Sequence, residues 1–200
     1  MIMKKIQLNT FSIKSLGLNK IMGMTLLMCF VTLSGLTQEK YSTKSGTIFF
    51  DASVSRSKPV PEATNNTVSA ILKDNGELTV LVFIDGFKFK KGLMQTHFNQ
   101  KKFMDSETYP KSKFVGKLEG FSVNELSDVK KDYPVSGQIT VRGVTKDITT
   151  TARVNYLNNK IYVESEFHLE IDDFNITVKK FYAMRVAKTV KVAIVLELKE

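Results

Sequence analysis

The chain has 200 residues, of which 42% are hydrophobic and 24% charged, and it contains four Pro and eleven Gly. These proportions are typical of a globular protein and exclude collagen-like, low-complexity and intrinsically disordered classes. A single Cys excludes a disulfide framework and a multi-cysteine metal site, and two His are too few for a three-histidine zinc centre. The formal charge of +9 suggests an anionic partner or surface, so its place along the chain matters.

The first 37 residues have the pattern of a secretory signal peptide. Residues 1–20 contain four lysines and no acid, and residues 21–33 form a charge-free apolar run. A bilayer-spanning helix needs ~20 apolar residues, and this run is shorter, as the core of a signal peptide is. The small residues Gly35 and Thr37 suit cleavage before Gln38. We therefore expect a signal peptide at 1–37 and an exported domain at 38–200, periplasmic or secreted, with an uncleaved N-terminal anchor as the alternative.

Removal of this segment changes the charge argument. Four of the 29 basic residues lie in it and none of the 20 acidic ones, which leaves a net charge of about +5. A charge of this size is weak evidence for nucleic-acid binding. The chain has no Trp, and its Phe residues fall in predicted strands instead of an aromatic–basic ladder. We expect no nucleic-acid partner.

Most of the remaining chain alternates between apolar and polar residues. Strict alternation with a period of two predicts antiparallel strands that have one buried and one exposed face. Turn residues separate the runs, including Asn75-Gly76 and Gly143, the latter expected to take a positive φ at a hairpin corner. The predicted strands cover residues 47–53, 67–73, 77–89, 112–121, 135–142, 148–156, 161–171 and 190–198. This spacing predicts a single all-β domain, either a closed barrel or a sandwich.

Two segments predict short helices. In residues 93–104, Met94 and Phe98 share one helical face. In residues 122–131, Ser122 and Glu125 have the spacing of a capping box.

The segment 77–89 is apolar on both faces in part, because Leu81 and Phe83 lie opposite the run from Leu78 to Ile84. Such a strand needs an outer cover, which a helix or a second subunit can supply. A homodimer is one expectation that follows.

Several ordered blocks resemble the YceI family. They are MQTHF (94–98), FMD (103–105), YPKSKF (109–114), VSGQITVRGVTK (135–146) and DFNI (173–176). The resemblance extends over roughly residues 94–198 and is to a shortened variant of the family. It implies an antiparallel eight-stranded lipocalin-like β-barrel that binds a polyisoprenoid lipid or an isoprenoid quinone.

On this resemblance and on strand parity, we expect an amphiphilic isoprenoid lipid as the partner. The predicted ligand-binding residues are Val80, Val82, Ile84, His97, Phe98, Phe114, Leu118, Ile139, Val154, Phe167 and Ile194. Lys101 and Lys102 belong to a basic cluster that would face the lipid headgroup and a transient membrane contact. The alternative is a ligand-free structural or protein-interaction module whose barrel is plugged by its own Phe and Leu side chains.

Catalysis has little support in the sequence. The chain contains no G-x-S-x-G, H-E-x-x-H or P-loop motif, and its lone Cys lies in the predicted signal peptide. We expect no enzyme activity, no metal and no cofactor other than the bound lipid or quinone.

Overall fold

The structure is a computed structural model that describes residues 39–54, 60–178 and 184–200. The predicted signal peptide, residues 1–37, lies outside the described residues, so its cleavage stays a prediction. Within the described ranges, no helix is both long enough and apolar enough to cross a membrane. The strands in the described ranges are β1 (Lys40–Asp51), β2 (Glu62–Lys73), β3 (Glu77–Phe83), β4 (Lys88–Phe89), β5 (Lys111–Leu118), β6 (Lys131–Val141), β7 (Val144–Leu157), β8 (Lys160–Glu170) and β9 (Thr189–Leu198).

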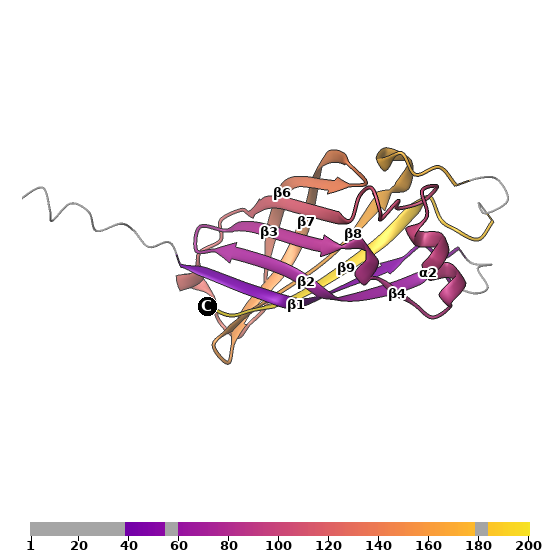
Figure 1. The fold of residues 1–200 in the computed structure, drawn as a ribbon. Coiled ribbons are helices and arrows are strands. Elements are labelled where there is room, and N and C mark those ends of the chain that lie inside the picture. Colours follow the sequence, from indigo (N-terminus) through magenta and orange to yellow (C-terminus); the bar gives the residue numbers. More distant parts are fainter. Residues whose placement is uncertain (1–38, 55–59, 179–183) are drawn as a thin grey trace, which may run out of the picture. The chain divides into compact units, whose positions relative to one another are not determined.

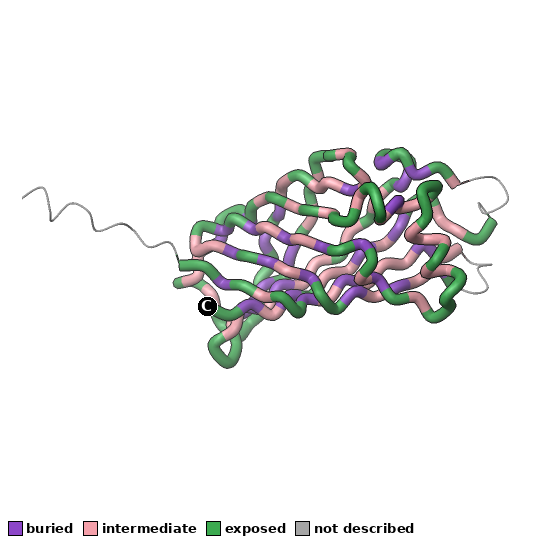
Figure 2. The backbone as a smooth tube through the Cα atoms, viewed as in Figure 1, coloured by how far each residue is buried: buried purple, intermediate pink, exposed green. Residues whose placement is uncertain are grey.

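The strands form one antiparallel sheet that closes on itself (Figure 1). Its order is β1-β9-β8-β7-β6-β5-β3-β2, and β1 pairs with β2 to complete the ring. The two-residue strand β4 adds to β2 alone, where Ala63 faces Phe89. The predicted eight-stranded antiparallel barrel is therefore confirmed, and the sandwich alternative is wrong. Buried and exposed residues alternate along the strands, as β3 shows (Figure 2).

The β6–β7 connection is a hairpin at the corner that the sequence predicted, and its loop has two residues. Val141 pairs with Val144, and the two residues between them, Arg142 and Gly143, have φ of 49° and 75°. Positive φ at both central positions matches the twist of the flanking strands. A Cβ atom on Gly143 would lie 2.7 Å from a ring carbon of Tyr109, so this position needs glycine for its backbone and for its neighbour.

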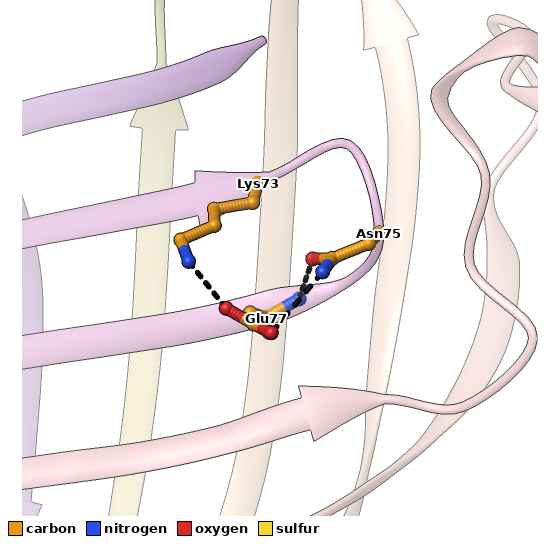
Figure 3. Close-up of polar contacts among 3 residues, drawn as sticks. All are labelled: Lys73, Asn75 and Glu77. Carbon is orange, nitrogen blue, oxygen red and sulfur yellow. Dashed lines mark hydrogen bonds and ion pairs between the residues drawn. The ribbon is translucent and has the colours of Figure 1, made fainter. Parts of the chain in front are cut away.

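The β2–β3 turn is held by three polar residues (Figure 3). Lys73 Nζ lies 2.5 Å from a carboxylate oxygen of Glu77, and Asn75 Nδ2 donates to the other oxygen at 3.1 Å. The Glu77 backbone N–H donates to Asn75 Oδ1 at 3.0 Å. Hydrogen bonds from Lys73 and Asn75 hold the pKa of Glu77 below its ordinary value.

The predicted strand 77–89 is broken in the structure. β3 ends at Phe83, and a 3₁₀ turn, η1 (Ile84–Gly86), precedes β4. The cause is the fully buried Asn65, whose Nδ2 donates to the Phe83 carbonyl at 2.8 Å. Gly86 packs directly on that amide, since a Cβ there would lie 2.5 Å from Asn65 Nδ2.

The outer face of β3 retains its apolar residues. Phe83 is 40% exposed, with Lys111 Nζ 5.2 Å from the centre of its ring, and Leu81 is half-buried. Covering of this face by a second subunit stays a prediction.

The second predicted helix, 122–131, is wrong. Only one 3₁₀ turn forms, η2 (Val123–Glu125), and Ser122 makes no side-chain capping bond. Leu126 is already extended, and the Ser127 carbonyl accepts a hydrogen bond from the Tyr156 N–H of β7 at 2.7 Å. The chain is thus drawn to the barrel wall after a single turn.

The first predicted helix is confirmed but is shorter. It is α2 (Gly92–Asn99), and the chain leaves it through hydrogen-bonded turns at Gln100 to Asp105. A last 3₁₀ turn, η3 (Ile171–Phe174), follows β8.

Candidate functional site

Half of the barrel encloses an apolar cavity. The space open to the centre of a water-sized sphere is about 160 Å³, roughly ten times what one water molecule needs. Its wall consists of inward side chains of β1, β3 and β5 to β9, together with residues of η1, α2 and η3. Ser112, Lys113, Thr150 and Ser165 are its polar lining residues, but the surface that the wall presents to the cavity is almost wholly apolar. Such a cavity favours an apolar chain, because each square ångström of apolar surface removed from water contributes roughly 25 cal/mol.

The other half of the barrel is solid, and we call it the closed end. On four neighbouring strands, the inward residue two positions beyond the last cavity residue is at most 2% exposed and does not line the cavity. These residues are Tyr133, Val154, Ile161 and Leu198. Leu118 on β5 joins them, and Phe121 packs edge-on against Tyr133 with ring centres 5.5 Å apart. The plugged interior that we considered for a ligand-free module is thus present in one half of the barrel.

The opposite, hollow end carries α2, and we call it the mouth (Figure 1). Phe98 of α2 lies among three aromatic rings, with centre distances of 5.8 Å to Phe50, 5.5 Å to Phe87 and 5.0 Å to Phe89. Gln95 adds a polar contact, since its Oε1 accepts the Phe89 N–H at 3.2 Å. No residue of α2 is fully buried, so this aromatic cluster is the main apolar contact that holds the helix over the cavity.

Arg142 ties three segments together at the mouth. Its guanidinium donates to the Lys101 carbonyl at 3.0 Å and to the Asn175 carbonyl at 2.5 Å. It also lies 6.0 Å from the centre of the Tyr109 ring. The β6–β7 hairpin, the segment after α2 and the segment after η3 are therefore fixed by one side chain. Beyond an Arg-Gly turn, no pattern in the sequence indicates this role of Arg142.

Phe114 lies on a floor made by two glycines. Gly116 and Gly137 face each other across β5 and β6, and both lie on the inward side of their strands, as Phe114 does. A Cβ on Gly137 would come within 2.9 Å of Phe114 Cζ, and one on Gly116 would touch the same atom. The ring therefore lies back along its own strand over the glycine pair.

The structure places most of the predicted ligand-binding residues on one cavity. Those that line it are Val80, Val82, Ile84, Phe98, Phe114, Ile139, Phe167 and Ile194. Leu118 and Val154 do not, because they are fully buried in the closed end. His97 lies half-buried on α2, outside the lining. Sequence reasoning missed Phe50, Phe87, Met104 and Phe174, of which Phe50 shares strand parity with Ile48 and could have been found.

The mouth is basic on its α2 side. Residues 86–104, which we call the lysine-rich segment, contain five lysines, including Lys101 and Lys102, and no acidic residue. Lys90 is paired with Glu62 of β2, and Lys102 Nζ lies 5.5 Å from the Phe103 ring. Among the residues that the structure describes, no group of three or more His, Cys, Asp and Glu side chains could hold a metal ion.

Comparison with known proteins decides the family. A model of the YceI-like domain matches residues 10–198, which is nearly the whole chain. The chain belongs to the YceI family. No curated protein matches it in sequence.

Solved structures share the YceI fold at low sequence identity. A polyisoprenoid-binding domain from Saccharophagus degradans is 15% identical, with a TM-score of 0.68 over 82% of this chain and 99% of that chain. BcnA from Burkholderia cenocepacia is 15% identical, with a TM-score of 0.65 over 78% of this chain and 96% of that chain. A YceI protein from Campylobacter jejuni is 19% identical, with a TM-score of 0.56 over 68% of this chain and 82% of that chain.

Proposed function

We propose that this YceI-family protein is an exported carrier that holds one isoprenoid-type lipid, a polyprenyl lipid or an isoprenoid quinone, in the barrel cavity. The observation that carries the proposal is the apolar cavity itself, which lies under α2 in a barrel that is otherwise filled. The name of the Saccharophagus degradans domain supports an isoprenoid as the ligand class. Binding without catalysis is the activity we propose, and periplasmic or secreted is the localisation.

The ligand-free module is the second candidate, and the filled closed end favours it. The cavity argues against it, because a purely structural barrel gains stability from a filled interior and loses dispersion contacts around an empty one. The two candidates differ in what enters the hollow half.

Displacement of an apolar fluorophore separates them. We expect N-phenyl-1-naphthylamine to bind saturably to the purified domain and farnesol or a short-chain ubiquinone to displace it at one site per chain. A matched variant, Ala152→Phe, fills the inner part of the cavity from a residue that lines it and is 1% exposed, and should reduce both signals while the domain stays folded. Equal fluorescence in the two proteins, or no displacement by any prenyl compound, contradicts the carrier.

A transient membrane contact at the mouth is part of the proposal. The cargo resides in membranes, and Leu93 of α2 is 68% exposed beside the lysine-rich segment. An exposed leucine and several lysines suit the surface of an anionic bilayer, at about 1 kcal/mol per lysine near the headgroups. Vesicle co-sedimentation should show binding to vesicles that contain phosphatidylglycerol and weaker binding after Leu93→Ser. Equal binding to neutral and anionic vesicles contradicts the contact.

A further inference from the structure

The cavity has a defined depth. Its lining runs from Val163 to Leu169 on β8 and from Val190 to Leu196 on β9, six residue steps on each strand. At about 3.3 Å per residue this is roughly 20 Å along a strand. Because barrel strands tilt by about 35–45° from the axis, the depth along the barrel is about 15 Å.

The bottom of the cavity is a set of side chains, not an open hole. Val154 on β7 and Leu118 on β5 are fully buried next to the deepest part of the lining. Ala152, two residues before Val154, is 1% exposed and lines the cavity, so it stands at the boundary between hollow and solid. A chain that enters at the mouth therefore stops at Ala152, with Val154 and Leu118 packed behind that boundary.

This depth has a counterpart in the membrane. The hydrocarbon core of a bilayer is about 30 Å thick, so one leaflet is about 15 Å. A lipid tail of leaflet length fits the cavity in one extended pass, with its headgroup at the mouth beside the lysine-rich segment.

We propose that the closed end sets a length limit for the ligand, which is a single tail of about one leaflet's length. The proposal rests on the proposed function and deepens it, because it names the size class of the ligand and the residues that set it. Each buried methylene raises affinity about fourfold, but only while the cavity still has room for it. Affinity should rise with chain length and then stop rising when the tail reaches the boundary at Ala152, behind which Val154 and Leu118 are packed.

The test is a chain-length series. Geraniol, farnesol, geranylgeraniol and solanesol, together with linear alcohols of matched length, are titrated against N-phenyl-1-naphthylamine in the wild-type domain. We expect a steep gain in affinity along the shorter members and no further gain once the tail exceeds the cavity depth. Affinity that keeps rising through solanesol contradicts the length limit.

Three variants locate the limit. Val154→Ala removes two methyl groups directly behind the bottom of the cavity, so the break, the chain length at which affinity stops rising, should move to longer chains. Ala152→Leu fills the bottom of the cavity and should move the break to shorter chains. Val82→Ala removes the same atoms from the side wall and is the matched control, with the break unmoved. Thermal unfolding confirms that each variant is folded, and Ala152→Leu keeps the test valid if Val154→Ala fails to fold.

The outcomes separate this inference from the proposed function. If the linear alcohols show the break and its shifts but no prenyl alcohol binds, the length limit is supported and the isoprenoid assignment is wrong. If prenyl alcohols bind and the break moves in neither Val154→Ala nor Ala152→Leu, the isoprenoid assignment is supported and the length limit is wrong. If no chain of either class binds, both fall.

Discussion

Truncation of Phe98 should release α2 from the mouth without unfolding the barrel. The Phe98 ring contacts three others at centre distances of 5.0 to 5.8 Å, and α2 has no fully buried residue and no side-chain cap. Each aromatic pair contributes about 0.5–1.5 kcal/mol beyond the buried area. A fully buried Phe→Ala change costs about 3–5 kcal/mol, and Phe98 is only half-buried. We therefore expect Phe98→Ala to cost about 2–3 kcal/mol, felt mainly as opening of α2.

Native-state hydrogen exchange measures this opening directly. The amides of α2 should exchange about 30- to 160-fold faster in Phe98→Ala than in the wild type, while amides in the middle of β7 and β8 change little. The matched control is Leu93→Ala on the same helix, where Leu93 is 68% exposed and the change should be within about 0.5 kcal/mol. Unchanged α2 protection in Phe98→Ala, or equal loss of protection throughout the barrel, refutes the argument that the Phe98 ring holds α2 over the mouth and that α2 opens separately from the barrel.

Three further variants test the hairpins and the mouth. Gly143→Ala should destabilise the domain by at least about 1–2 kcal/mol in urea unfolding, because φ there is +75° and the new Cβ would lie 2.7 Å from a tyrosine ring carbon; Gly92→Ala, with open space around it, should cost nothing. The pKa of Glu77 is lowered in the folded state, so its stabilisation is complete above its ordinary value of 4.5 and is lost as the pH falls through the lowered value. Glu77→Gln should flatten that acid-side fall in the urea midpoint, and an unchanged curve would show that the turn contributes nothing. Replacement of Lys101 and Lys102 by Gln should weaken binding of a prenyl pyrophosphate more than that of a neutral quinone, and equal effects would exclude a headgroup role.

The barrel could be predicted because apolar and polar residues alternate along most of its strands in the sequence. Apart from residues 77–89, each predicted run is found as a strand, and Arg142-Gly143 forms the expected hairpin corner with the predicted positive φ at Gly143. The break after Phe83 could not be predicted, because it depends on a buried hydrogen bond from Asn65, eighteen residues earlier in the chain. The capping-box pattern at Ser122 failed for a similar reason, since the following segment hydrogen-bonds to β7 through the Ser127 carbonyl and does not continue as a helix.

The cavity was only partly predictable. Strand parity separates inward from outward side chains, and Phe114 and Val154 are both inward. Parity does not say how far along the barrel the inward side chains meet and fill it, so Val154 and Leu118 were assigned to the ligand although they form the closed end. The glycine floor under Phe114 and the Arg142 contacts need the register between strands, which alternation alone does not define.

If the proposed function holds, the hollow half of the barrel carries a lipid in the cell. Native mass spectrometry of the protein purified from the envelope of its own cells, under mild conditions, tests it most directly. We expect one additional mass per chain, which solvent extraction releases and which fragments as a prenyl lipid or quinone. A protein that emerges at the mass of the bare chain, from cells rich in such lipids, would contradict it.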